Sequence, residues 1–289
     1  MSINLHGADQ TWGDNTGEGL KNMPAGSTVD ATVQRRKSGV ASLVRGEGID
    51  VFGVQEAKAA WLTALDEELN EFGRAGEATY TLNTQEGNFI YYRKNRFDVL
   101  AADTFWLVNG APTSVSMSGT YKVDGCANDR ICTWAIFRDK ETGSCFLFMN
   151  THLDTSGDTV TTAQANVLLS QISVILAANG MDADCPVMIT GDMNSEPTTN
   201  TYAAYTQNLT DTCVEVDSPY VNYNTGYGYN YVDSTTEAYR VDGHRIDYVF
   251  VSETVTTYGY NMIHTSTNLC PYGEYLTDHN AVIAQVGLD

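Results

Sequence analysis

The sequence predicts an α/β fold with two stacked, mixed β-sheets flanked by helices. Short apolar runs rich in β-branched and aromatic residues recur along the 289 residues, which is the pattern of mostly buried strands. Between some of these runs, apolar residues recur at three- and four-residue spacing, as they do in amphipathic helices. Other runs follow one another directly, which indicates mixed sheets, and two sheets covered by helices accommodate so many strands.

In chain order, the first predicted strand is Met1 to Leu5. Further strands are predicted at 50–55, 88–93, 132–138, 145–151, 186–191, 245–251 and 280–286. Helices are predicted where apolar side chains share one face, at 33–45, 61–72 and 167–176. The segments 104–129 and 213–244 are long, polar and rich in Gly, Asn and Tyr, so we expect loops that form the walls of a functional site.

The composition does not divide the chain into parts. No Pro-rich, Ser-rich or like-charge run separates two halves and no segment repeats another, so we expect one domain over residues 1–289. The sequence contains no uninterrupted apolar stretch of about 18 residues, so no transmembrane segment is predicted. We expect a monomer.

The charge balance is strongly acidic. There are 36 Asp plus Glu against 16 Lys plus Arg, which gives a formal net charge of -20. General affinity for nucleic acid comes from Lys and Arg that displace counterions from phosphates. Long DNA or RNA is therefore a disfavoured partner, although a local basic cleft or bound cations would override the average charge.

The six cysteines form no Cys-x-x-Cys pair, so neither a zinc knuckle nor a thioredoxin-like site is indicated. Cys126 and Cys132 flank a short polar stretch that a disulfide would staple. Cys145 and Cys185 lie in apolar runs, where buried free thiols are equally expected. The even count, and a chain that starts inside a strand as if a leader had been removed, favour an extracellular or periplasmic protein, with the cytoplasm as the alternative.

Polar residues gather where the predicted strands end. Asp192 and Asn194 follow a buried apolar run, and residues i and i+2 of an extended chain point to the same face. One carboxylate and one carboxamide therefore project together from a core strand. The same pattern recurs at Gln55 and Glu56, at His152 and Asp154, at Asp247, and at Asp278 and His279.

Each of these residues alone has an ordinary structural explanation as a turn former, a helix cap or a satisfied histidine. Together they form a complete set for hydrolysis assisted by a metal. Carboxylate and amide oxygens suit Mg²⁺ or Mn²⁺, imidazoles stabilise charge or move protons, and a carboxylate activates water. No cysteine joins the set, which argues against zinc.

In order and approximate spacing, five segments resemble the motifs of the endonuclease/exonuclease/phosphatase superfamily, and Asn4 matches its first motif. The segments are Gln55-Glu56, Asn150 to Asp154, Gly191 to Asn194, Ile246 to Phe250 and Thr277 to Asn280. Within the superfamily, the stretches 104–107 and 130–135 resemble a bacterial, often exported subgroup whose substrates are poorly defined. The resemblance covers essentially the whole chain and implies a four-layer α/β sandwich with divalent-metal-dependent phosphoesterase activity.

The resemblance also implies a role for each matching residue. Glu56 would be the principal metal ligand, with Asn4 and Asp278 nearby and acting through water. Asp192 would orient or deprotonate the attacking water. Asn194 would hold a non-bridging phosphate oxygen.

Two histidines complete the implied site. His279, held by Asp247, would contact the phosphate, and His152 would act as a general acid or transition-state donor. Hydrolysis of a phosphate ester is slow because an anionic nucleophile must approach an anionic centre. A cation lowers that barrier. Hydrogen-bond donors lower it too, because their bonds strengthen as negative charge spreads over the phosphoryl oxygens.

The residues that would bind the rest of the substrate are less specific. Arg130 would reach a phosphate from its loop or serve as a salt-bridge partner. The Tyr-rich segment 220–239, which includes Tyr231, would stack a sugar or a base beside basic residues such as His244 and Arg245. The alternative for this segment is a rigid, Tyr-packed surface loop.

We therefore expect a phosphate mono- or diester of a small or lipid-derived substrate. One alternative is a secreted metal-dependent nuclease that uses cations to screen its own charge. A second alternative is a non-catalytic binding protein on the same scaffold.

Overall fold

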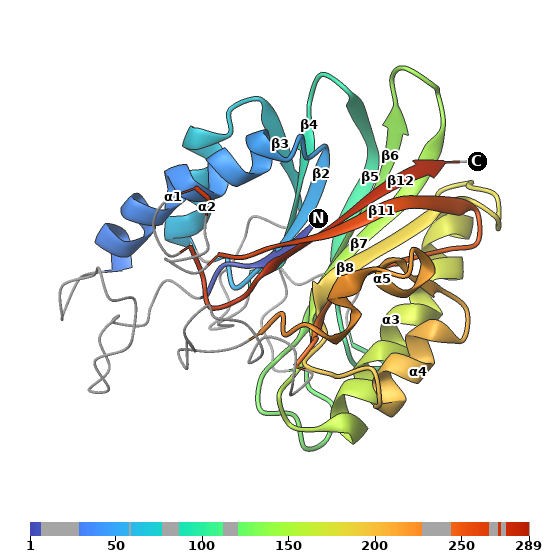
Figure 1. Cartoon of the computed structure of the whole chain (residues 1–289). Coiled ribbons are helices and arrows are strands. Elements are labelled where there is room, and N and C mark those ends of the chain that lie inside the picture. Colours follow the sequence, from blue (N-terminus) through green and yellow to red (C-terminus); the bar gives the residue numbers. More distant parts are fainter. Residues whose placement is uncertain are drawn as a thin grey trace.

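The computed structural model describes residues 1–6, 29–57, 59–76, 87–111, 121–226, 244–265, 271–272 and 276–288. Two six-stranded sheets stack against each other, and helices lie on their outer faces (Figure 1). Both sheets contain parallel and antiparallel pairs. The predicted α/β sandwich with two mixed sheets is confirmed.

The first sheet has the strand order β11-β12-β1-β2-β4-β3. Strands β1 and β2 are parallel, whereas β12 is antiparallel to β1. The ends of β1 and β2 and the start of β12 therefore lie at the same edge. The strands are β1 (Ser2–Asn4), β2 (Val51–Gln55), β3 (Phe72–Ala75), β4 (Phe89–Arg93), β11 (Val255–Ile263) and β12 (Ala281–Leu288).

The second sheet has the order β5-β6-β7-β8-β10-β9. Strands β7 and β8 are parallel and β10 is antiparallel to β8, so the ends of β7 and β8 meet the start of β10. The strands are β5 (Phe97–Trp106), β6 (Ile131–Asp139), β7 (Cys145–His152), β8 (Val187–Asp192), β9 (Thr210–Asp211) and β10 (Asp247–Val251).

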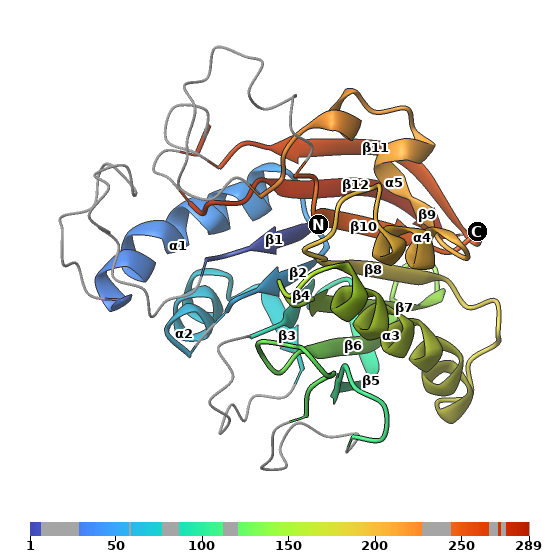
Figure 2. The same cartoon turned by 90° about the horizontal axis from the view of Figure 1, so that it is seen from below.

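Helices α1 (Val29–Gly46) and α2 (Ala59–Glu68) lie on one side of the sandwich, and α3 (Asp158–Ala178) and α4 (Asn200–Thr206) lie on the other (Figure 2). Two short helices, α5 (Thr212–Glu215) and the 3-10 helix η1 (Pro219–Asn222), follow β9. Apolar side chains fill three layers. Trp61 and Phe52 belong to the layer under α1 and α2, Leu168 and Ile189 to the layer under α3 and α4, and Phe146 and Val282 to the layer between the sheets.

Among the described helices, α3 is long and apolar enough to cross a membrane by length and composition. Its buried residues include Val160, Leu168 and Leu176, which form one face. Leu168 and Leu176 belong to the apolar layer of the second sheet. In this structure α3 is therefore a covering helix of the sandwich.

The described cysteines carry free thiols. The disulfide considered between Cys126 and Cys132 is not formed, because Cys132 is fully buried in β6 and Cys126 lies in the loop before it. Burial raises the pKa of the Cys126 thiol to about 11. Cys145 and Cys185 are free as well, whereas Cys270 lies outside the described residues.

Candidate active site

Sheet register brings three of the predicted residues together. His152 lies opposite Asp192 across the parallel pair β7 and β8, and Asp192 lies opposite Asp247 across the antiparallel pair β8 and β10. In the first sheet Asn4 is the last residue of β1, and Glu56 directly follows β2. All five side chains therefore start from the same edge of the sandwich.

Asn4 joins the two sheets at this edge. Its Nδ2 donates to Glu56 Oε1 at 3.1 Å and to Asp192 Oδ2 at 3.0 Å. Its Oδ1 accepts from the backbone N–H of His6 at 2.9 Å. One buried amide thus holds two carboxylates close together, and in this arrangement Asn4 faces them with its donor group.

Asp192 lies at the centre of the site. Its Oδ2 is 3.5 Å from His152 Nε2 and 3.6 Å from His279 Nε2. Its Oδ1 accepts from the backbone N–H of Asn194 at 3.0 Å. The carboxylate is buried, and one of its oxygens faces two imidazoles, which is the geometry of a group that exchanges a proton or a water with them.

His279 and Asp247 form a buried pair across the two sheets. His279 Nδ1 lies 2.8 Å from Asp247 Oδ2, which leaves Nε2 directed at Asp192. Burial alone would lower the pKa of His279, but Asp247 and Asp192 outweigh it and raise this pKa well above its usual value. The two carboxylates therefore favour the protonated imidazole, which is a hydrogen-bond donor at Nε2.

Thr225, a residue that was not predicted to belong to the site, supports this pair from the predicted 213–244 loop. Its hydroxyl accepts from the backbone N–H groups of Ile246 and Asp247, both at 2.9 Å. Its carbonyl accepts from the backbone N–H of Asn280 at 2.7 Å. Nothing in the sequence around Thr225 predicts this contact, which depends on how the loop after η1 returns to the sheet edge.

His6 is a second residue that the sequence reading missed. Its Nδ1 lies 3.0 Å from Asp278 Oδ2, and both residues are buried. Burial alone would raise the pKa of Asp278, but the hydrogen bond and charge of His6 outweigh it and lower this pKa. The spacing of two residues from Asn4 was the signal that could have identified His6.

Three residues of the site have backbones in the left-handed region. The φ angles are 52° at His6, 56° at Glu56 and 45° at Asn194. Residues other than glycine rarely adopt this backbone conformation, and those that do often lie at functional sites. At Asn194 the turn directs the side-chain Nδ2 to the carbonyl of Leu153 at 2.8 Å, next to His152.

The residues expected to bind the rest of the substrate are not gathered in the same way. Arg130 is 3% exposed and pairs through Nε with Asp154 Oδ2 at 3.4 Å, so it is a buried salt-bridge partner. Asp154 also accepts from the backbone N–H groups of 127 and 128 and so anchors the loop before β6. His244 is exposed and pairs with Glu196 at 2.8 Å, whereas Tyr231 lies outside the described residues.

Arg245, considered as a phosphate-binding group, is also committed elsewhere. Its Nη1 lies 2.7 Å from Asp211 Oδ2, and its guanidinium lies 4.8 Å from the centre of the Tyr248 ring. The side chain is 1% exposed. It therefore stabilises the second sheet rather than reaching a substrate.

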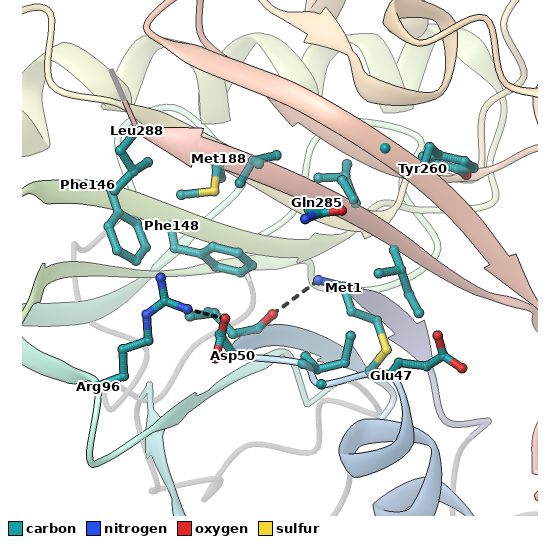
Figure 3. A pocket seen from close by; sticks show the side chains of 18 of the residues that line it. Met1, Glu47, Asp50, Arg96, Phe146, Phe148, Met188, Tyr260, Gln285 and Leu288 are labelled. Carbon is teal, nitrogen blue, oxygen red and sulfur yellow. Dashed lines mark hydrogen bonds and ion pairs between the residues drawn. The ribbon is translucent and has the colours of Figure 1, made fainter. Parts of the chain in front are cut away.

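A cavity of about 600 Å³ lies at the opposite edge of the sandwich (Figure 3). Its lining includes Met1, Phe146, Met188 and Leu288. Phe146 and Met188 lie at the start of β7 and β8, whereas the site residues lie at the end of these strands. The cavity is therefore separate from the edge that holds Asp192.

The site residues fit a hard divalent cation. Glu56, Asp192 and Asp278 supply carboxylate oxygens, which are the ligands that Mg²⁺ and Mn²⁺ prefer. Ligand atoms of Asp192, Asp247 and His279 also lie within 4.8 Å of one another. Since Asp247 and His279 already share a hydrogen bond, the carboxylates near Asn4 are the better candidates for a cation.

A sandwich of this kind, with carboxylates and imidazoles from both sheets at one edge, carries the groups that hydrolysis of a phosphoric ester requires. The chain belongs to the endonuclease/exonuclease/phosphatase family, whose model matches residues 1–279. Enzymes of this family are generally dependent on divalent metals. The predicted family and enzyme class are therefore confirmed.

Solved structures with the same fold cover nearly the whole chain. An endonuclease/exonuclease/phosphatase from Bacteroides vulgatus is 26% identical, with 100% of this chain and 97% of that chain covered and a TM-score of 0.70. A mannosyl-6-phosphatase from Bacteroides thetaiotaomicron is 24% identical, with coverage of 99% and 98% and a TM-score of 0.74. TDP2 of D. rerio with a single-strand DNA product is 18% identical, with coverage of 99% and 97% and a TM-score of 0.62. None of the curated proteins searched matches the chain.

Proposed function

We propose that this protein is a Mg²⁺-dependent phosphatase that hydrolyses a phosphate ester of a small polar metabolite. The observation that carries the proposal is the single hydrogen-bonded unit of Asn4, Glu56 and Asp192, which faces two imidazoles. It combines oxygen ligands for a cation with groups that handle a proton. That combination is what the attack of water on an anionic phosphorus centre requires.

Glu56 is the residue proposed to hold the cation, with Asp278 as a further candidate ligand and Asn4 orienting the Glu56 carboxylate. Glu56 is half-buried and lies at the edge of the sheet, directly after β2. When bound, Mg²⁺ supplies positive charge that offsets the charge of the substrate phosphate. Asp278 is kept ionised by His6, which preserves the oxygen donors of the site.

The roles of the remaining residues follow from their donors and acceptors. Asp192 accepts the proton of the attacking water, because its Oδ2 is directed into the site. Protonated His279 donates through Nε2 to a phosphoryl oxygen, and His152 acts as the general acid that protonates the ester oxygen as its bond to phosphorus breaks. Asn194 uses one N–H for Leu153, and its second N–H is available to the phosphate.

A small phosphorylated metabolite is favoured over nucleic acid by charge. The net charge of -20 repels a polyanion over its whole length, whereas a monoester brings only one phosphate to the site. The similarity to a mannosyl-6-phosphatase makes sugar phosphates the first class to test. The similarity to TDP2, solved with a DNA product, makes single-stranded DNA the matched comparison.

The substrate class is tested by measuring phosphate release from hexose phosphates, inositol phosphates and nucleotides, and cleavage of single-stranded and plasmid DNA, all with Mg²⁺ at physiological salt. We expect turnover of a sugar or related small phosphate ester, with little cleavage of DNA. Efficient cleavage of DNA with no release from any small ester would overturn the proposed substrate and favour a nuclease.

Metal dependence gives a prediction for Glu56. Chelation with EDTA should abolish turnover, and added Mg²⁺ or Mn²⁺ should restore it. Glu56→Gln should raise the Mg²⁺ concentration for half-maximal activity by about tenfold or more, because a neutral amide is a weaker ligand than a carboxylate.

The matched control is Glu253→Gln, which removes an exposed carboxylate from the turn between β10 and β11. It should leave the Mg²⁺ requirement unchanged. Equal Mg²⁺ requirements for the two variants would exclude Glu56 as the principal ligand.

A further inference from the structure

The site is divided between two sheets whose contact is otherwise largely apolar. Glu56 belongs to the first sheet and Asp192 to the second, so their separation depends on how the sheets are aligned. Between the sheets lie Phe146, Phe148 and Met188. Apolar contacts of this kind are non-directional, whereas hydrogen bonds between buried polar side chains are directional and fix the position of one strand relative to another.

One step along the strands from the site, the apolar layer gives way to buried amides and hydroxyls. Along β7, side chains at alternate positions point to the same face, in the order Phe148, Asn150, His152; along β8 the order is Met188, Thr190, Asp192. Gln55 occupies the equivalent position in the first sheet, directly before Glu56. Asn150, Thr190 and Gln55 all have no exposed surface.

We infer that Gln55, Asn150 and Thr190 form a cross-sheet clamp that positions Glu56 and Asp192 for catalysis. Asn150 Oδ1 accepts from Gln55 Nε2 at 2.6 Å and from the Thr190 hydroxyl at 3.1 Å. These hydrogen bonds connect one strand of the first sheet with two strands of the second. The inference deepens the proposed function and rests on it.

Asn150 is the centre of the cross-sheet clamp. Its Nδ2 donates to the carbonyl of Val54 at 2.8 Å and to the carbonyl of Phe89 at 3.1 Å, both in the first sheet. With the two bonds accepted by Oδ1, the amide makes four hydrogen bonds, which is its full capacity. Because hydrogen bonds are directional, the side chain fixes β7 against the end of β2 and the start of β4.

Gly53 shows how closely the sheets approach at the clamp. A Cβ built on Gly53 would lie 2.2 Å from Asn150 Oδ1 and 2.4 Å from Thr190 Oγ1. Any larger residue would push these groups away from the first sheet. The missing side chain therefore makes room for the amide and the hydroxyl that cross between the sheets.

The test uses Thr190→Val, which keeps the shape of the side chain and removes its hydroxyl. We expect kcat to fall about tenfold while KM stays within about twofold of wild type. The dissociation constant for Mn²⁺ should rise as well, because groups that position a metal ligand affect both metal affinity and turnover. Thr190→Ser restores the hydroxyl and should restore kcat. Gln55→Met should show the same pattern. In the double variant Thr190→Val with Gln55→Met, the fold-decrease in kcat should be smaller than the product of the two single decreases, because both residues act through Asn150.

The matched control is Thr104→Val, which removes a buried hydroxyl hydrogen-bonded to Thr133 at 3.0 Å, on the edge strand β5 and two strands away from Asn150. It should lower the melting temperature by a similar amount without changing kcat or Mn²⁺ affinity.

Equal kcat and Mn²⁺ affinity in Thr190→Val and Thr104→Val would overturn the inference alone. A wild-type protein that binds Mn²⁺ but hydrolyses no ester would overturn the proposed function, and the cross-sheet clamp would then be judged by Mn²⁺ affinity. A wild-type protein that neither binds Mn²⁺ nor hydrolyses any ester would overturn both.

Discussion

Replacing Asp192 by asparagine should lower kcat by about 10³-fold or more, with KM changed little. The variant keeps the shape of the side chain and removes its charge, so the fall in kcat reports proton transfer and charge rather than packing. The change also removes a buried carboxylate held close to Glu56 by Asn4. The like charge of Glu56 opposes the Asp192 carboxylate whereas His279 favours it, so the two effects offset each other and we expect the melting temperature to change little.

The measurement is steady-state phosphate release together with thermal unfolding in the absence of metal. The control is Asp182→Asn, which neutralises an exposed carboxylate in the turn after α3. It should match wild type in both experiments. An Asp192→Asn enzyme that retains near wild-type kcat would remove Asp192 from the chemistry.

The second large effect concerns the pair of His279 and Asp247. Each single change, His279→Gln or Asp247→Asn, should lower kcat by about 10²-fold or more, because the first removes a donor to the phosphate and the second removes the group that holds it. The double variant should be no slower than the slower single variant. Residues that act as one unit show this non-additivity, since Asp247 acts through the imidazole.

A pH profile adds an independent readout for the pair. The raised pKa of His279 means that its protonated form is kept as pH rises and is lost only when pH passes the raised value. Without the Asp247 charge this pKa should fall, so Asp247→Asn should lose activity at a lower pH than wild type does. Two results together would contradict the coupled pair. They are a kcat of the double variant that falls by the product of the two single decreases, and an alkaline side of the pH profile that is unchanged in Asp247→Asn.

The central strands were predictable from the sequence, whereas the edge strands were not. β2, β4, β6, β7, β8 and β10 are largely buried and carry continuous apolar runs, which the sequence pattern identified. The strands that were missed, β3, β5, β9 and β11, are the four edges of the two sheets. Edge strands contact solvent along one side, and β5 exposes Val99 and Leu100, so their sequences lack the buried pattern. The helix predicted at 61–72 is wrong at its end for a related reason, because Phe72 begins β3.

The polar residues at strand ends were predictable because extended backbone fixes the face of each side chain. Asp192 and Asp247 become neighbours through sheet register alone. The contacts of the loop residues were not predictable, because an arginine next to a site can contact either the substrate or an internal carboxylate. Arg130 faces Asp154 in the folded chain, and only the path of the loop before β6 decides this.

The most direct test is the location of Mn²⁺ and inorganic phosphate in crystals of the protein, measured by anomalous scattering. We expect Mn²⁺ against the Glu56 carboxylate, and phosphate oxygens within hydrogen-bonding distance of His279 and Asn194, on the side faced by Asp192. Mn²⁺ and phosphate bound at any other place, with this edge of the sandwich empty, would contradict a phosphate-ester hydrolase built from these residues.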